Sequence, residues 1–101
     1  MAADPLSTLS RIDPRMRKHL AEVDELVYGS GALSRKIKLL IALAFDAAHG
    51  ASSGVQALAR AAMKEGATSE EIAEALRVAY HLAGVGALYT GSIGLSDLFA
   101  Q

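Results

Sequence analysis

The residues of this chain that are suited to acid–base or nucleophilic chemistry gather around one turn, in the stretch FDAAHGASSG at residues 45–54. Asp46 and His49 are three apart in a segment of helical pattern, so both side chains project from the same side of that helix. A carboxylate so placed can fix the tautomer of an imidazole, and the hydroxyl of Ser52 or Ser53 supplies a nucleophile. One hypothesis for the turn is therefore acid–base catalysis through His49.

The same residues also have a structural interpretation and a binding interpretation. An imidazole in the last turn of a helix is favoured by the helix dipole, and serine is an ordinary N-cap for the helix that follows. The free N–H groups at the start of that next helix, with His49 beside them, would also attract a small anionic molecule. The residues predicted to line such a ligand site are Ser52, Ser53, Gln56 and Tyr80.

His81 is a second candidate acid or base, since it lies just before the glycine pair at 84 and 86. A metal site would need Asp46, His49 and His81 to converge, and nothing in their spacing requires that they do. We therefore predict no metal and no cofactor.

The composition limits the classes of protein to which the chain can belong. It has 101 residues, which is the length of one domain, and it has no cysteine, which excludes disulfides, thiolate catalysis and cysteine-ligated metals. The net charge is −1, so neither nucleic acid nor an anionic membrane is expected as a partner. No apolar run approaches the roughly 18 residues of a membrane span, and we expect a cytoplasmic protein.

The hydrophobic pattern predicts an all-α fold, a compact bundle of about five helices in one domain of residues 13–101. Residues 1–12 are polar, and we expect them to be loosely ordered. Hydrophobic residues make up 51 % of the chain, a large share for a lone small domain, so we expect a homo-oligomer. The predicted helices run from Asp13–Pro14 to Gly29, from Ser34 to Gly50, from Ser52 or Ser53 to Gly66, from the capping box Thr68–Glu71 to Gly84, and from Ala87 to Phe99.

The apolar positions also predict which faces are buried. Residues 39–45 are apolar all round, which is typical of a helix covered on every side, and the covering is easiest if a second subunit takes part. This helix and the final one are the predicted interface. The residues expected to face inward on the next two helices include Leu58, Met63 and Leu82, whereas Gly91 and Gly94 should weaken the last helix.

Three stretches in order, GALSRKIKLLIALA (31–44), AAMKEGATSEEIAEAL (61–76) and HLAGVGAL (81–88), resemble the carboxymuconolactone decarboxylase superfamily, which includes the alkyl-hydroperoxidase D-like proteins. The resemblance implies an all-helical protein that assembles as a dimer, trimer or hexamer. The peroxidase branch has a Glu before the turn, a Cys-x-x-Cys motif at the turn, and a His four residues after the second Cys.

This chain departs from that pattern at each chemical position. The Cys pair falls on Ala51 and Gly54, the His on Leu58 and the Glu on Leu39. Thiol peroxidase activity is therefore not expected, and the decarboxylase branch, which keeps the His, is not matched either. We predict that Leu39 and Leu58 are buried against each other or against shared neighbours.

Two functions remain open at this stage. The chain is either a non-redox oligomeric protein that binds a small molecule or a partner, or a cofactor-free enzyme that uses His49, Asp46 or His81 in decarboxylase- or lyase-like acid–base chemistry on a small carboxylate or lactone.

Overall fold

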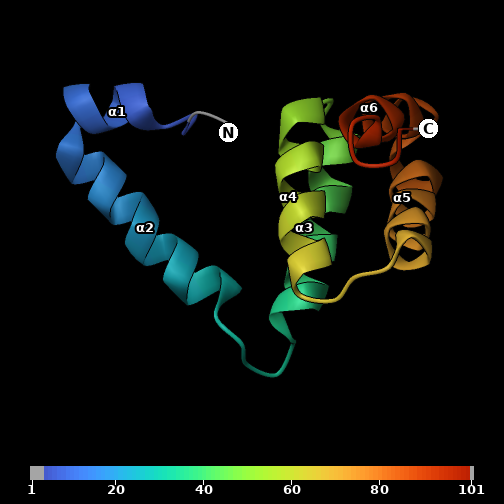
Figure 1. The fold of residues 1–101 in the computed structure, drawn as a ribbon, viewed down its shortest axis with the longest axis horizontal. Coiled ribbons are helices and arrows are strands. Elements are labelled where there is room, and N and C mark those ends of the chain that lie inside the picture. Colours follow the sequence, from blue (N-terminus) through green and yellow to red (C-terminus); the bar gives the residue numbers. More distant parts are fainter. Residues whose placement is uncertain (1–3, 101) are drawn as a thin grey trace.

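The structure is a computed structural model that describes residues 4–100, and six helices and no strand lie in this range (Figure 1). The all-helical prediction is confirmed, with one helix more than expected. The helices are α1 (Ser7–Ile12), α2 (Pro14–Tyr28), α3 (Arg35–Ala48), α4 (Ser52–Lys64), α5 (Ser69–Ala83) and α6 (Gly86–Leu95).

Short-range side-chain caps fix the starts of three helices where the sequence predicts them. Asp13 accepts a hydrogen bond from a backbone N–H in the first turn of α2 at 3.0 Å, and Ser34 accepts one from α3 at 3.2 Å. At α5 both halves of the capping box are present: the Glu71 N–H donates to the Thr68 hydroxyl at 3.1 Å, and the Thr68 N–H donates to the Glu71 carboxylate at 2.9 Å.

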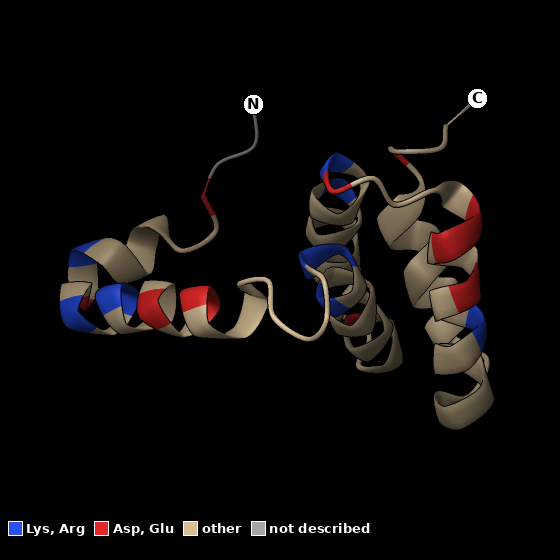
Figure 2. Ribbon diagram, turned by 90° about the horizontal axis from the view of Figure 1, so that it is seen from below, with Lys and Arg blue, Asp and Glu red and all other residues tan. Residues whose placement is uncertain are grey.

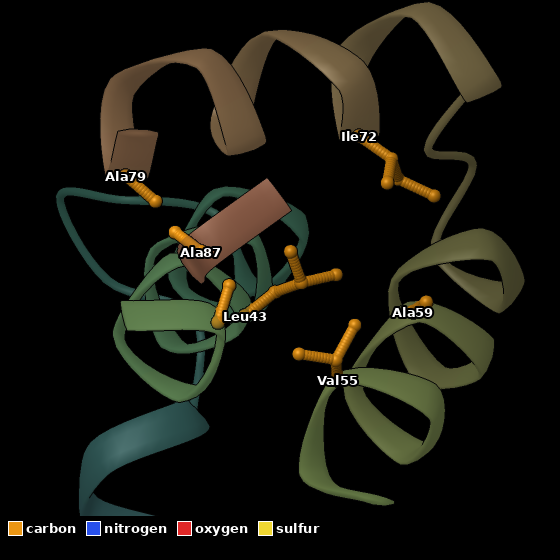
Figure 3. Close-up of a cluster of buried hydrophobic side chains, with 7 residues drawn as sticks. Leu43, Val55, Ala59, Ile72, Ala79 and Ala87 are labelled. Atoms are coloured by element: carbon orange, nitrogen blue, oxygen red, sulfur yellow. The ribbon is translucent and has the colours of Figure 1, made fainter. Parts of the chain in front are cut away.

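Helices α3 to α6 form a bundle around a small aliphatic core (Figure 3). Leu43, Val55 and Ile72 are its largest fully buried side chains, at 0–1 % exposure. Alanines from four helices fill the space between these side chains, which lets the helix axes approach closely. The buried alanines of this core are Ala47, Ala59, Ala79 and Ala87.

Gly91 and Gly94 allow α6 to lie directly against its neighbours. A Cβ atom on Gly94 would stand 2.5 Å from the carbonyl oxygen of Ser52 and 2.8 Å from Cβ of Val55. A Cβ on Gly91 would stand 2.6 Å from a methyl group of Leu76. Both glycines are buried. They lower the helix propensity of α6, as expected, but they make its packing possible.

Helices α1 and α2 form an arm that projects from the bundle, and Figure 1 shows it on the opposite side of α3 and α4 from α5. No residue of either arm helix is buried. Of the segment 1–12 that was expected to be loosely ordered, residues 1–3 lie outside the described chain, whereas residues 7–12 form α1. An ion pair from Arg17 to Asp4, at 4.0 Å, links α2 to the start of the arm.

The buried faces of one chain differ in part from the predicted ones. On α3, Ile41 and Phe45 are 45 % and 60 % exposed, so the complete burial predicted for this helix stays a prediction about an oligomer. On α4 and α5, Met63 and Leu82 point outward, at 39 % and 81 % exposure. These side chains are exposed because no other helix of the same chain covers the outer side of α3 and α5. The last helix also ends earlier than predicted, at Leu95.

Candidate functional site

The turn between α3 and α4 is an elbow held by backbone hydrogen bonds. Gly50 adopts a positive φ of 78°, which a residue with a side chain would adopt only with strain. The Ala51 N–H then donates to the carbonyl oxygen of Asp46 at 2.9 Å, and the Val55 N–H donates to the carbonyl oxygen of Ala51 at 3.0 Å. The chain thus reverses within three residues and presents the start of α4 toward the end of α3.

The Asp46 carboxylate lies against the first turn of α4. A Cβ atom built on Gly54 would overlap Oδ2 of Asp46, so only a glycine leaves room for the carboxylate at this place. A negative charge beside a helix N-terminus is favoured by the helix dipole. The chain's own carboxylate therefore lies beside the helix start that was predicted to attract an anion, although it caps none of its N–H groups.

His49 has no catalytic partner within residues 4–100. It is exposed, and its ring packs against Phe45 with 6.3 Å between ring centroids. No hydrogen bond joins it to Asp46 among the described residues: Asp46 lies in α3, whereas His49 is the C-cap that follows the last residue of that helix. The predicted pairing of carboxylate and imidazole is therefore not formed in the described structure.

The other predicted ligand residues are spread over the surface. Ala51, and not a serine, is the N-cap of α4, and no side chain caps that helix. Ser53 is exposed and Ser52 half-buried. Gln56 donates to the carboxylate of Asp97 at 3.1 Å, which links α4 to the segment after α6. Tyr80 and His81 are both exposed on α5.

Two further features of the described part of the chain concern metal-ligating side chains and long apolar helices. No three His, Asp or Glu side chains in it lie close enough to hold a metal ion. None of its helices combines the length and the hydrophobicity that a membrane span requires.

Leu39 and Leu58, which the resemblance aligns with the Glu and the His of the peroxidase branch, behave as core residues. Leu39 is 2 % exposed and packs with Ala62 and Ala67. Leu58 is half-buried and lies against both this cluster and the main core. The predicted burial around shared neighbours is therefore observed, completely for Leu39 and partly for Leu58.

A cleft of about 520 Å³ lies between the arm and the bundle, directly over these two leucines. We call it the arm cleft. Leu39, Leu58 and Ala61 form its apolar floor. Its remaining walls are mostly polar and come chiefly from α2, the link after it and the start of α3: Arg17, Ala21, Asp24, Glu25, Tyr28, Gly29, Ser30 and Arg35.

The charges in the arm cleft are largely balanced. Both of its arginines lie near carboxylates outside α2: Arg17 is 4.0 Å from Asp4, and Arg35 is 3.6 Å from Glu65. The guanidinium of Arg35 stands over the ring of Tyr28 at 5.9 Å, which ties the start of α3 to the end of α2. Sequence reasoning missed this cleft, because its residues lie on separate helices and no local motif connects them.

Comparison with known proteins gives one match. A family model described as the carboxymuconolactone decarboxylase family matches residues 14–91. The match starts at the first residue of α2 and ends within α6, so it includes the elbow, both leucines and most of the arm. No curated protein and no solved structure matches the chain.

Proposed function

Since the chain belongs to the carboxymuconolactone decarboxylase family, we propose that it is a member without redox chemistry, an oligomeric helical protein that binds a small molecule. The alternative to be tested is that it binds a protein partner instead of a small molecule. One observation carries this proposal: leucines occupy the positions where the peroxidase branch has Glu and His, and both are packed into the bundle. With no cysteine in the chain, no thiol relay can be assembled.

The arm cleft is the place where such a molecule would bind. Its volume lies in the range of about 300–1,000 Å³ that is usual for small-molecule sites. An apolar floor with arginine and tyrosine above it suits a small apolar body that carries one carboxylate. Because both arginines already face carboxylates, an anionic ligand would compete with these and bind weakly.

Filling the cleft tests this assignment. Titration of isotope-labelled protein with short-chain carboxylates and with the matching alcohols should move the amide resonances of residues that line the cleft, and the carboxylates should move them more. Ala61→Phe should abolish these shifts, whereas Ala73→Phe, on the exposed side of α5, should leave them intact. Shifts that survive Ala61→Phe, or that are centred on His49, would place the site elsewhere.

The proposed absence of thiol peroxidase activity has a separate test. Purified, metal-free protein supplied with a hydroperoxide and a dithiol reductant should give no sustained turnover. Turnover above that of the buffer would overturn this part of the proposal.

The alternative is a cofactor-free enzyme that acts on a small carboxylate or lactone through His49 or His81. It requires an oriented imidazole, and in the described chain Asp46 faces α4. Conversion of a lactone by the wild type that is lost in both His49→Ala and His81→Ala would favour this alternative.

A further inference from the structure

The arm carries an apolar stripe that its own bundle does not cover. Met16, Leu20, Val23 and Val27 recur at helical spacing along α2, and all but the half-buried Leu20 are 36–46 % exposed. The side of α2 that faces the bundle is a different one, and it brings Arg17, Asp24 and Glu25 to the arm cleft. The arm therefore turns mostly polar side chains toward its own chain and leaves its apolar side free.

A second apolar surface lies on the other side of the bundle. Four large side chains, Ile41, Phe45, Val78 and Leu82, are 45–81 % exposed there. With four alanines they line a groove of about 290 Å³ between α3 and α5, which we call the α3–α5 groove. Figure 2 shows that charged residues lie on the arm and on the bundle, but none of the residues that line this groove is charged. The groove is thus an uncharged surface of the kind that a helix face covers.

The total surface shows how much of the chain lacks a covering. Its accessible area is 6992 Å², whereas a compact protein of 10.5 kDa exposes about 5,400 Å². Its radius of gyration is 14.2 Å, compared with about 12.7 Å for a compact domain of this length. The excess of about 1,600 Å² is roughly twice the 800 Å² that each partner of a standard interface buries. A second copy of the chain brings enough area to cover both surfaces.

The arm is held in place at its base, so it does not easily turn onto its own groove. Nζ of Lys38 donates to the carbonyl oxygen of Gly29, and Arg35 stacks on Tyr28. Both contacts fix the end of α2 against the start of α3. Figure 1 shows α5, which forms one wall of the groove, on the far side of α3 and α4 from the arm, so the stripe of one chain does not lie beside its own groove.

We infer that the stripe of α2 docks into the α3–α5 groove of a second copy of this chain. Either a reciprocal pair or a closed ring then covers every stripe and every groove. The inference rests on the oligomeric part of the proposed function and adds to it the two surfaces that meet. The arm cleft remains open, because docking uses a different side of α2.

The absence of cysteine allows a direct test by cross-linking. Chains that carry Val23→Cys and chains that carry Phe45→Cys are co-expressed and treated with a short bismaleimide. A covalent dimer should form from the mixture, and from neither variant alone. Glu22→Cys, also exposed on α2 but off the stripe, should give no dimer with Phe45→Cys.

Light scattering on the wild type separates failure of this inference from failure of the oligomeric proposal. A mass that is a multiple of 10.5 kDa is expected, and Val23→Glu should reduce it to that of one chain while Glu22→Lys should not. Two outcomes would overturn the docking but not the oligomeric proposal. In one, cross-links join Val23→Cys only to Val23→Cys of another chain. In the other, a chain that carries both cysteines forms cross-links only within itself. A folded wild-type monomer at micromolar concentration would overturn both.

Discussion

Leu58 shows how one residue type alters both the chemistry and the packing of this fold. The family resemblance aligns this residue with a histidine of the peroxidase branch. Here it is an aliphatic side chain that contacts both hydrophobic clusters of the bundle. Its partial burial removes apolar surface from water, which stabilises the fold.

Truncation of Leu58 should therefore destabilise the protein, but less than truncation of a fully buried leucine. Leu58→Ala should lower the free energy of unfolding by an amount near the lower end of roughly 2–5 kcal/mol, because the side chain is only half-buried. Leu43→Ala, at 0 % exposure, should lie near the upper end of the same rough range. Denaturant titration measures both, with the exposed Arg60→Ala as control. A loss of unfolding free energy below about 1 kcal/mol for Leu58→Ala would show that the Leu58 side chain does not fill the space between the two hydrophobic clusters.

Gly94 gives a prediction of the opposite kind, since here a larger side chain should destabilise. Gly94→Ala would place Cβ against backbone and a β-branched side chain, neither of which can move freely, and should cost about 1–3 kcal/mol. Gly86→Ala meets nothing within 4 Å and should stabilise by about 0.4–1 kcal/mol. Thermal unfolding of the two variants should therefore shift in opposite directions; equal shifts would rule out the close approach of α6.

At the scale of elements, α5 is joined to α3 by its own cap. The Glu71 carboxylate closes the capping box and also accepts a hydrogen bond from Nζ of Lys36 at 2.9 Å. Lys36, and then the Thr68 N–H, lower the pKa of Glu71 below its ordinary value of 4.5. The ionised form is thus favoured in the folded state.

A lowered pKa sets the direction of the pH dependence. The contribution of Glu71 is fully present above pH 4.5 and is lost as the pH falls through the lower pKa of the folded state. Glu71→Gln keeps an acceptor for the Thr68 N–H but not the charge. The difference in unfolding free energy between wild type and Glu71→Gln should therefore shrink as the pH falls through the folded-state pKa of Glu71. Glu74→Gln, exposed on the same helix, is the control; a difference that stays constant with pH would contradict the role of Lys36.

Helix starts are predictable from the sequence, whereas the covered faces of helices are less so. The caps at Asp13, Ser34 and Thr68 depend on residues within one turn, and all three are confirmed. Leu82 has the spacing of an inward residue but is exposed, because inward and outward depend on which helix lies alongside. Periodicity locates an apolar side of a helix without identifying what covers it.

At the candidate site, too, local spacing does not establish which residues of different helices lie together. Spacing predicts Asp46 and His49 on one side of one helix, but α3 ends at Ala48 and His49 is its C-cap. Asp46 faces α4, because Gly54 leaves room for it there. The arm cleft joins residues of α2, α3 and α4 that no local pattern relates. The family resemblance, by contrast, was carried by ordered motifs, and the family model matches residues 14–91. Of the two leucines that the resemblance singles out, Leu39 is buried and Leu58 is half-buried.

The whole molecule consists of a well-packed bundle and an arm with little packing of its own. Helices without buried residues gain little stability from tertiary contacts, and helices of this length are marginal in water by themselves. The arm should therefore be the least stable part of an isolated chain. Its stability should rise wherever its apolar stripe is covered.

Amide hydrogen exchange at two protein concentrations distinguishes these states. In dilute solution the amides of α2 should exchange much faster than those of α4, since local opening of the arm exposes no core. At high concentration, docking onto a second copy should slow exchange in α2 and along the groove-lining part of α5, because only the assembled form protects these amides. Peptides from α4, which borders neither surface, should change little and serve as the internal control. Protection of α2 equal to that of α4 at every concentration would mean that the arm is stabilised within its own chain.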